Sequence, residues 1–537
     1  MIRLPKLSQL LPFAGAVLAI ALPLTMPTRS HSIPAFSRMY NTSCSTCHLD
    51  FPKLNDFGKA FKDAGFKFPT DDESMIKNPP VMLGAPAQKE LWPHSIWPGK
   101  IPGMPPIGLR MNNFFQVTGE HRNEFQFVPA GTTTPSVPTF VPRTNFETGL
   151  FSIFTAGNFG SDIAFWVDDD ISVTGENGNG GLGDGYLRFV NLGRLLHLPK
   201  DSLSLRAGQF EIDLPFSPAR SWNLSPWDIF GQTNVGVTGV HNVSNGFTLD
   251  TPGQGVEFSG GHHYGGYWYS VAFINQNTTG VTDPGAFVPT VTGNPFQSDS
   301  SFKDIYGHFE YRFNLERDKD SRRAIQAAGK MGPRDHTYIS VGVFDFYGRS
   351  VNRILGATST GAPTLLTARE PFYRVGGDFS FNYRTFNLFG VWMHGHDHNL
   401  IPIDATGAIF PATPVSFIAG APSTFSGGFL QADYRALPWI MLIMRYDGVN
   451  SPEDRINGLA GSTDTPFFAP VMATRNRYTP GVQFLIHANI KASFEYQVRP
   501  RQQIAPTAGL LNPVTLNPVF TKPFRVNTAV AGLEFVY

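Results

Sequence analysis

The sequence predicts an all-β protein, a 16-stranded antiparallel transmembrane β-barrel with a small helical segment at its N-terminus as a plug. Three observations predict this fold. Apolar and polar residues alternate in one segment after another beyond residue 106, long and short connections take turns between these segments, and the last segment ends on an aromatic residue. Each pattern is typical of barrels of the bacterial outer membrane.

The first 32 residues are expected to be a secretory signal peptide. Arg3 and Lys6 precede an apolar stretch from Leu10 to Leu24, and small polar residues follow it. The apolar stretch is too short, and too often interrupted by proline, to be a good membrane helix. We therefore expect residues 1–32 to be removed and the mature chain to begin near Ile33, outside the cytoplasm.

Composition narrows the class of protein further. The 42 Lys and Arg residues equal the 42 Asp and Glu residues, so the chain has no basic field and we expect no nucleic-acid partner. Charged residues make up only 16%, and phenylalanine and glycine are abundant at 47 and 54 residues. No later stretch approaches the roughly 18 consecutive apolar residues of a membrane helix. If the chain contacts outer-membrane lipid, it does so through strands.

The two cysteines of the chain, Cys44 and Cys47, stand directly before His48 in the motif Cys-Ser-Thr-Cys-His. Covalent attachment of haem c requires this spacing, because two thiols must reach the two vinyl groups of one porphyrin while the adjacent imidazole serves as the proximal iron ligand. The alternative is a short-loop disulfide with His48 beside it by chance. In an exported chain with no other cysteine, the motif favours one covalent haem c.

The segment around the motif, residues 33–105, is predicted to be a small cytochrome c-like unit. Apolar residues recur there at three- and four-residue steps and stop before Gly65, which predicts a short amphipathic helix: Phe51, Leu54, Phe57, Phe61 and Ala64. One face of this helix would cover a porphyrin. The segment is too small for a full core of its own, so we expect the haem to form much of that core.

The distal iron ligand is left open by the sequence. Met75, Met82 and His94 all lie in the proline-rich continuation of the segment. Met82 is preferred, because a rigid loop led by Pro79 and Pro80 can present its thioether to the iron. A methionine that merely fills a gap in the core, or an open or water-bound iron, are the alternatives.

Residues 106–537 are predicted to form the barrel. Tyr373, Val375, Phe379, Phe381 and Tyr383, for example, alternate with polar and charged residues, so that one face of the strand is apolar and the other polar. Such a strand suits a soluble sandwich or a barrel that turns its apolar face to lipid. The even number of predicted strands and the alternation of long and short connections favour the barrel. Sixteen strands are expected near 108–120, 146–156, 160–170, 184–192, 203–210, 254–261, 266–274, 303–313, 337–347, 372–382, 385–394, 425–434, 438–446, 477–485, 488–497 and 525–537.

Long connections, such as 121–145, 211–253 and 395–424, are expected at the cell surface, and short ones, such as 383–384 and 435–437, at the periplasmic end. Residues 314–336 depart from this rhythm, because they are periplasmic by position yet long, charged and helix-capable. They could dock a soluble periplasmic partner or form an ordinary solvated helix.

Two polar clusters near the predicted outer ends of strands could bind a metal ion. One contains His394, His396, Asp397 and His398, and the other contains Asp168, Asp169 and Asp170. Imidazole and carboxylate suit ferrous or ferric iron, and carboxylates also suit calcium. The alternative for each cluster is an ordinary polar barrel rim.

A monohaem segment followed directly by a sixteen-strand barrel resembles the fused cytochrome-porin proteins of the bacterial outer membrane. The resemblance rests on Pro34-Ala35-Phe36, the motif from Cys44 to His48, the stretch "FPKLNDFGKAFKDAGF" after it, and the barrel. It implies electron transfer through a haem, with a periplasmic cytochrome or another soluble carrier as one partner. The best-known members of this family oxidise ferrous iron at the cell surface, so the resemblance also implies a possible ferrous-iron oxidase with an extracellular metal ion or mineral as the other partner.

The thickness of the membrane favours the same role. A hydrocarbon core of about 30 Å is too wide for one tunnelling step between soluble carriers on its two sides, so a haem must lie within the wall. Two other functions compete: a porin or transport channel whose haem segment is a structural plug, and a soluble exported haem enzyme. The sequence shows no distal Arg-His pair beside the motif that such an enzyme would use.

Overall fold

The computed structural model describes a large part of the chain. The described residues are 35–40, 42–68, 81–82, 86–91, 93–94, 100–101, 107–118, 124–125, 139–140, 144–159, 162–170, 181–217, 220–221, 223–225, 227–230, 249, 252–275, 303–315, 337–398, 400–408, 413–419, 422–450, 475–498 and 527–537. The predicted signal peptide, Met75 and residues 316–336 lie outside them.

Among the described residues, the helices are short. The α-helices α2 (Ala35–Tyr40), α3 (Asp56–Asp63) and α5 (Pro86–Leu91) and the 3₁₀ turn η2 (Cys44–Thr46) precede the barrel, and the 3₁₀ turn η3 (Leu192–Leu196) lies between two of its strands. Short strand pairs are β1 (His48–Asp50) with β2 (Lys53–Leu54), β3 (Val81–Met82) with β4 (Lys100–Ile101), β6 (Glu124–Phe125) with β7 (Thr139–Phe140), and β18 (Leu400–Ile403) with β19 (Ser416–Ala419). Among the described residues, no helix is long and apolar enough to cross a membrane.

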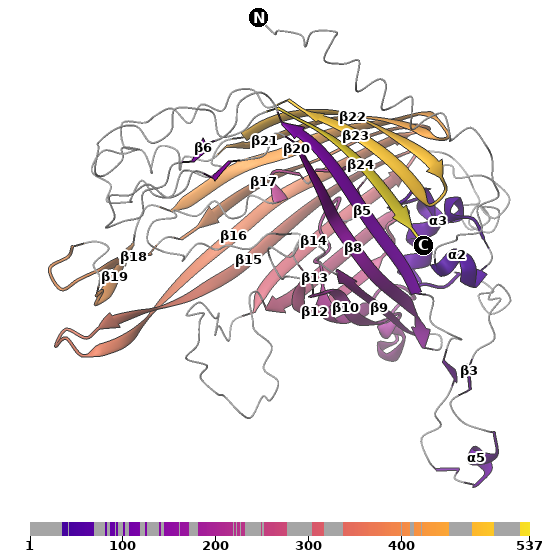
Figure 1. Ribbon diagram of the computed structural model, residues 1–537. Coiled ribbons are helices and arrows are strands. Elements are labelled where there is room, and N and C mark those ends of the chain that lie inside the picture. The colour runs from indigo at the N-terminus through magenta and orange to yellow at the C-terminus, as the bar shows by residue number, and fades with distance from the viewer. Residues whose placement is uncertain are drawn as a thin grey trace, which may run out of the picture.

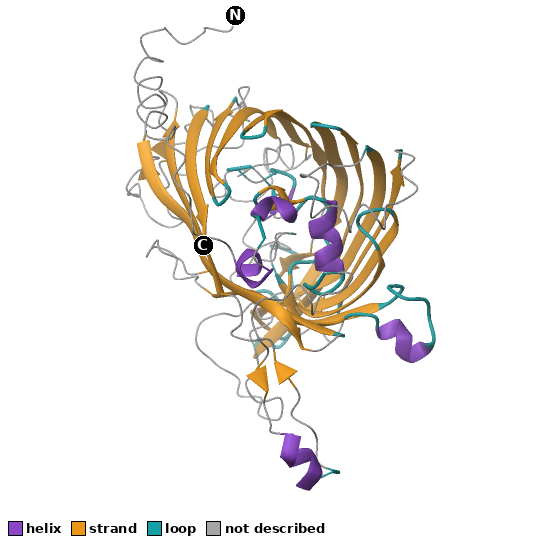
Figure 2. Ribbon diagram, turned by 90° about the vertical axis from the view of Figure 1, so that its right-hand side faces the viewer, coloured by secondary structure: helices purple, strands orange, loops and turns teal. Residues whose placement is uncertain are grey.

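The remaining strands close into one antiparallel ring, in which β24 pairs with β5 (Figures 1 and 2). They are β5 (Ile107–Thr118), β8 (Thr144–Phe159), β9 (Ile163–Asp170), β10 (Gly181–Phe189), β11 (Ser204–Phe210), β12 (Gly253–Gly261), β13 (Gly266–Asn275), β14 (Asp304–Asn314), β15 (Tyr338–Ala357), β16 (Pro363–Tyr383), β17 (Phe386–Asp397), β20 (Ser423–Leu437), β21 (Ile440–Asn450), β22 (Arg475–His487), β23 (Ile490–Gln497) and β24 (Thr528–Val536). This confirms the predicted closed barrel of sixteen strands, each of which overlaps its predicted range.

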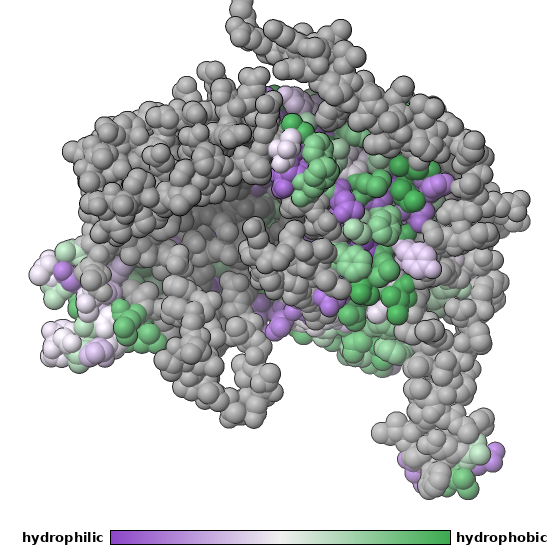
Figure 3. All heavy atoms as spheres, in the orientation of Figure 1, coloured by the Kyte–Doolittle hydropathy of each residue, from purple (hydrophilic) through white to green (hydrophobic). Residues whose placement is uncertain are grey.

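Burial along the strands is the reverse of that in a soluble protein. On β16, Tyr373, Val375 and Phe379 are exposed, whereas Arg374 and Asp378 are buried. Figure 3 shows hydrophobic side chains on the outer surface where the strands are described. A sheet that shows apolar groups outward and encloses charged groups is stable only when lipid surrounds it.

Two connections differ from the sequence-based expectation. β15 and β16 continue to a five-residue turn at 358–362 and form a hairpin that projects from the barrel, where a longer loop was expected (Figure 1). The connection 211–253, expected at the cell surface, instead folds into the lumen over its described residues: Asn223 Nδ2 donates to Gln431 Oε1 at 2.9 Å, and Trp227 stacks on Phe429. Trp227 and its apolar neighbours Ile229 and Phe230 are fully buried there among inward-facing aromatic residues, which makes burial more favourable than exposure to water.

The opposite end of the lumen holds the N-terminal segment. Figure 2 shows α2 and α3 within the ring of strands. They pack on β8 and β9 through a cluster of Met39, Tyr40, Phe61, Phe66, Ala156, Ala164 and Val190. Tight turns such as 384–385 and 438–439 lie at this end of the barrel, which the loop-length rule makes the periplasmic end.

Candidate functional site

The two cysteines lie on a short turn inside the barrel. Cys44 begins η2, and the backbone N–H of Cys47 donates to the carbonyl of Cys44 at 3.2 Å. The side chain of Ser43 caps this turn by accepting from the N–H of Ser45. Both thiols are free, so each is available for a thioether bond.

Asn55 fastens this turn to helix α3. Its Oδ1 accepts from the N–H of Gly58 at 2.8 Å and so caps the helix. Its Nδ2 donates to the carbonyl oxygens of Ser45 and Thr46, and its backbone N–H donates to the carbonyl oxygen of Cys47. A Cβ added at Gly58 would clash with the Cys47 carbonyl oxygen, so only glycine lets the helix approach this closely.

The helix after the motif begins later than predicted. The apolar periodicity from Phe51 suggested that the helix includes Phe51 and Leu54, but α3 begins at Asp56. Proline at position 52 and the pairing of β1 with β2 keep the preceding residues extended, and the Asn55 cap sets the start. The predicted end is confirmed, because Gly65 has a φ of +80°.

His48 is held in one orientation. Its Nδ1 lies 3.2 Å from the carbonyl oxygen of Pro52 and donates to it, which leaves the Nε2 lone pair free. Burial lowers the pKa of His48 to about 4, so the imidazole is neutral at pH 7. A neutral ring with a free Nε2 and a fixed second nitrogen is what a metal-ligating histidine requires.

Cys44, Cys47 and His48 all line one cavity of about 340 Å³ between the plug and the barrel wall. This volume falls in the range of roughly 300–1,000 Å³ typical of small-molecule and cofactor sites. Most of the lining is apolar, with Phe36, Phe61, Phe66 and Trp166 among the aromatic side chains. Arg110, Lys62 and Arg220 add cationic groups to the same lining, and Asp168, Asp184 and Glu211 add carboxylates. Arg110 pairs with Glu534 and Arg220 with Glu211. The apolar lining, the two thiols and the imidazole fit the flat ring of haem, and Lys62 offers a cation to its carboxylate edge.

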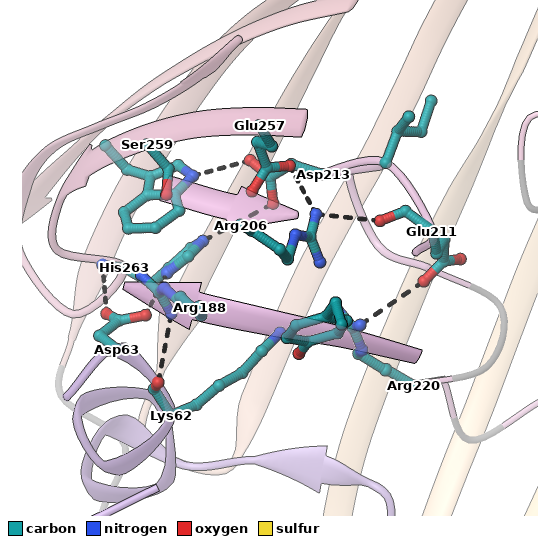
Figure 4. Close-up of a pocket in the computed structure, with 13 residues that line it drawn as sticks. Lys62, Asp63, Arg188, Arg206, Glu211, Asp213, Arg220, Glu257, Ser259 and His263 are labelled. Carbon is teal, nitrogen blue, oxygen red and sulfur yellow. Dashed lines mark hydrogen bonds and ion pairs between the residues drawn. The ribbon is translucent and has the colours of Figure 1, made fainter. Parts of the chain in front are cut away.

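This cavity shares part of its lining with a charged pocket, which gives the cavity a polar end (Figure 4). Lys62, Tyr186, Glu211 and Arg220 line both spaces. Burial and then the nearby cations Arg220 and Arg206 lower the pKa of Lys62 to about 7. An anionic group at this end would stabilise the Lys62 ammonium, so it suits the carboxylate edge of a cofactor.

Ion pairs hold the plug against the wall. Arg312 of β14 makes two hydrogen bonds to the Asp56 carboxylate, at 2.7 and 2.8 Å. At the other end of α3, Asp63 Oδ1 lies 2.8 Å from His263 Nδ1, in the turn between β12 and β13. Lys53 pairs with Asp433 at 3.3 Å and donates to Asn387 at 2.8 Å. These contacts come from three strands and one turn at separate points of the wall, so they fix both the position and the rotation of the plug.

The predicted distal ligands are not brought to the cavity by the described residues. Met82 lies in β3, which Figure 1 draws apart from α2 and α3, and its side chain is outside the description. His94 is exposed and is not part of the cavity lining. Met82 as distal ligand therefore stays a prediction.

The histidine cluster of β17 faces away from the lumen. His394 and His396 follow the outward-facing Trp392, and His396 stacks on the exposed Tyr373. Along the strand, His394 lies seven residues from Asn387, which contacts the plug, so about 23 Å separates the two positions at ~3.3 Å per residue. A metal ion on these histidines would be far from the motif.

The acidic cluster is divided between the two faces of β9. Asp168, expected at the outer rim, lines the cavity and accepts from Trp166 Nε1 at 3.2 Å. Asp169 is exposed on the other face, and the side chain of Asp170 lies outside the description.

Asn55 and Gly58 were not predicted from the sequence, although the order Asn-Asp-x-Gly contains a helix-cap signal that could have identified both. Arg312 and Lys62 were not predicted either. The sequence offers no signal for them, because their partners lie hundreds of residues away or in a cavity made by several strands.

No protein-family model matches the chain, and no curated protein matches it. Solved porin structures are similar in fold. The anion-selective porin from Comamonas acidovorans is 11% identical with a TM-score of 0.41, over 80% of this chain and 98% of that one. OprB of Pseudomonas putida is 10% identical with a TM-score of 0.41, over 80% and 94%. OmpF of Salmonella typhi is 10% identical with a TM-score of 0.40, over 80% and 97%.

The closed ring with its outward apolar belt decides the class. The chain is a porin-like β-barrel of the bacterial outer membrane. Its lumen differs from an open aqueous pore, because the described residues place a plug at one end and the 211–230 segment further along.

Proposed function

We propose that this porin-like barrel is an electron-transfer protein that carries one covalent haem c in its plug. The observation that carries the proposal is the shared cavity, lined by two free thiols and by an imidazole with its Nε2 free. Bound haem c would supply a one-electron redox centre. Cys44 and Cys47 would hold it covalently, and His48 would ligate its iron.

The chain's own residues surround this site with aromatic side chains and keep it rigid. Phe36, Phe61 and Phe66 pack on one another within the plug. The hydrogen bond from His48 to the Pro52 carbonyl keeps the imidazole from rotating. A rigid, largely apolar site favours electron transfer, because little of the surrounding protein must rearrange when the charge changes.

The position of the plug supports a periplasmic partner. It lies at the end with the tight turns, so a soluble periplasmic carrier can approach it closely. The extracellular donor or acceptor, with ferrous iron as the leading candidate, would exchange electrons with the haem from the opposite side of the barrel. With ferrous iron as the donor, the protein would act as a ferrous-iron oxidase.

Mass spectrometry and spectroscopy of the purified mature protein test the proposal. We expect the mass of one added haem, its loss in Cys47→Ala, and a c-type spectrum that can be reduced and reoxidised. A matched Ser45→Ala variant, altered between the cysteines, should keep the haem. An unmodified mass with a Cys44–Cys47 disulfide would refute it.

The second candidate is a transport channel with a haem-bearing structural plug, favoured by the many charged groups that line the lumen, such as Arg374, Arg445 and Asp447. Large ion conductance in planar bilayers, without reversible reduction of the haem, would support this function instead. Electron transfer predicts low conductance, because the plug and the 211–230 segment occupy the lumen.

A further inference from the structure

A group of metal-ligating side chains lies in the lumen, outside the cavity that contains the cysteine motif. His308 and Glu310 occupy alternate positions of β14, and Asp378 belongs to β16. One ligand atom from each lies within 4.8 Å of the others. His308 and Asp378 are buried, and Glu310 is partly exposed to the lumen.

Strand register brings these groups together. Glu310 pairs with Gly342 of β15, and Gly342 pairs in turn with Asp378. A Cβ added at Gly342 would clash with Asp378 Oδ2, so the Asp378 carboxylate lies over the space that a side chain would fill. Glycine at this position thus lets a carboxylate from one strand reach ligands two strands away.

Asp213 orients His308 from the side opposite Asp378. His308 Nδ1 lies 2.9 Å from Asp213 Oδ2, while its Nε2 points to Asp378 Oδ2 at 3.2 Å. Trp268 Nε1 donates to the same Asp213 oxygen at 2.7 Å and fixes its position. A metal-ligating histidine usually donates its other ring N–H to a carboxylate, and Asp213 is placed to accept it here.

Glu310 completes the group. Among the described residues, its carboxylate accepts no hydrogen bond, although the Lys59 ammonium of α3 lies near enough to interact with it electrostatically. Lys59 also lies 3.9 Å from Asp56, so it is shared between two carboxylates. The Glu310 side chain is therefore available to a cation that enters from the lumen.

We propose that His308, Glu310 and Asp378 bind one divalent first-row transition metal ion. One imidazole and two carboxylates suit manganese, ferrous iron or zinc, and the nitrogen donor favours these ions over magnesium and calcium. The metal replaces the contact between His308 and Asp378, and any proton held there is released to solvent. Asp213 would remain the hydrogen-bond partner of Nδ1.

This site is linked to the plug by a chain of side-chain contacts. Asp213 Oδ1 lies 3.8 Å from His263 Nε2, and His263 pairs with Asp63 of α3. A metal ion bound here would thus be near the plug, unlike one on the outward-facing histidines of β17. Metal binding does not rest on the covalent haem, so the two proposals can fail separately.

Titration of the purified full-length barrel with Mn²⁺, followed by electron paramagnetic resonance, tests the site. We expect one bound Mn²⁺ per chain, with pulsed spectra showing coupling to one histidine nitrogen. Glu310→Gln and Asp378→Asn should each weaken binding at least tenfold. The triple variant His394→Ala, His396→Ala, His398→Ala is the control and should bind as the unaltered protein does.

Glu310→Gln is the decisive variant, because Glu310 is partly exposed and accepts no hydrogen bond from the described residues, so the barrel should still assemble. Unchanged Mn²⁺ affinity in this assembled variant would overturn the proposal. Loss of binding in the triple histidine variant would overturn it as well, since it would place the metal on the outer face.

Discussion

Replacing Asp56 by asparagine should loosen the plug from the barrel. The Arg312 guanidinium is 1% exposed and the Asp56 side chain 13%, so the pair is nearly dry. Breaking a buried pair by removing one partner costs about 3–5 kcal/mol, because the remaining charge is left uncompensated. The lower value applies here, since asparagine keeps one oxygen for Arg312 and Tyr338 lies 3.6 Å beneath the guanidinium.

A loss of about 3 kcal/mol corresponds to roughly a 100-fold larger population of undocked plug, at 1.4 kcal/mol per factor of ten. Hydrogen exchange of the α3 amides measures this population directly. We expect those amides to exchange about 100-fold faster in Asp56→Asn than in the unaltered protein. Asp404→Asn, which removes an exposed carboxylate from a loop, is the control and should leave the exchange unchanged.

A double-mutant cycle separates the pair from other effects of Asp56, which also lies at the N-terminus of α3, where its charge contributes about 0.3–1 kcal/mol. Asp56→Asn combined with Arg312→Gln should cost less than the sum of the two single changes. Additive costs, or unaltered exchange in Asp56→Asn, would show that the ion pair does not hold the plug.

Three further predictions concern the plug and the lumen. Gly58→Ala should lower covalent haem loading, measured by mass spectrometry, because the added methyl displaces the Cys47 carbonyl; full loading would contradict the close approach. Burial alone would lower the pKa of His263, but Asp63 and Asp213 raise it from 6.5 to about 9, so this contact stabilises docking fully below pH 6.5 and is lost as pH rises through about 9. Exchange of the α3 amides should quicken over that range, beyond its intrinsic pH dependence, and His263→Gln should abolish the effect. Trp227→Ala should cost about 3–5 kcal/mol and raise bilayer conductance, because it frees the 211–230 segment; unchanged conductance would mean that this segment does not limit the lumen.

The strands and the cysteine motif could be predicted from short stretches of the sequence. Alternation over ten residues states which side chains share a face, and the reversal seen on β16, with Tyr373 outward and Arg374 inward, follows from it once lipid is the solvent. The motif from Cys44 to His48 was equally readable, because its spacing is a property of five consecutive residues. Helix α3 was predicted with the correct end, but its start depended on the less obvious Asn55 cap.

The sequence could not predict which distant groups meet inside the barrel. Gly342 and Asp378 face each other because of strand register, and Arg312 meets Asp56 only after the plug enters the closed ring. The 211–230 segment appeared to be an outer loop because length alone suggests exposure, whereas its aromatic residues gain more by packing in the lumen. Periodicity along one strand fixes the direction of a side chain. The residue that this side chain contacts depends on the neighbouring strands and on the segments that fill the lumen. Only the tertiary structure supplies both.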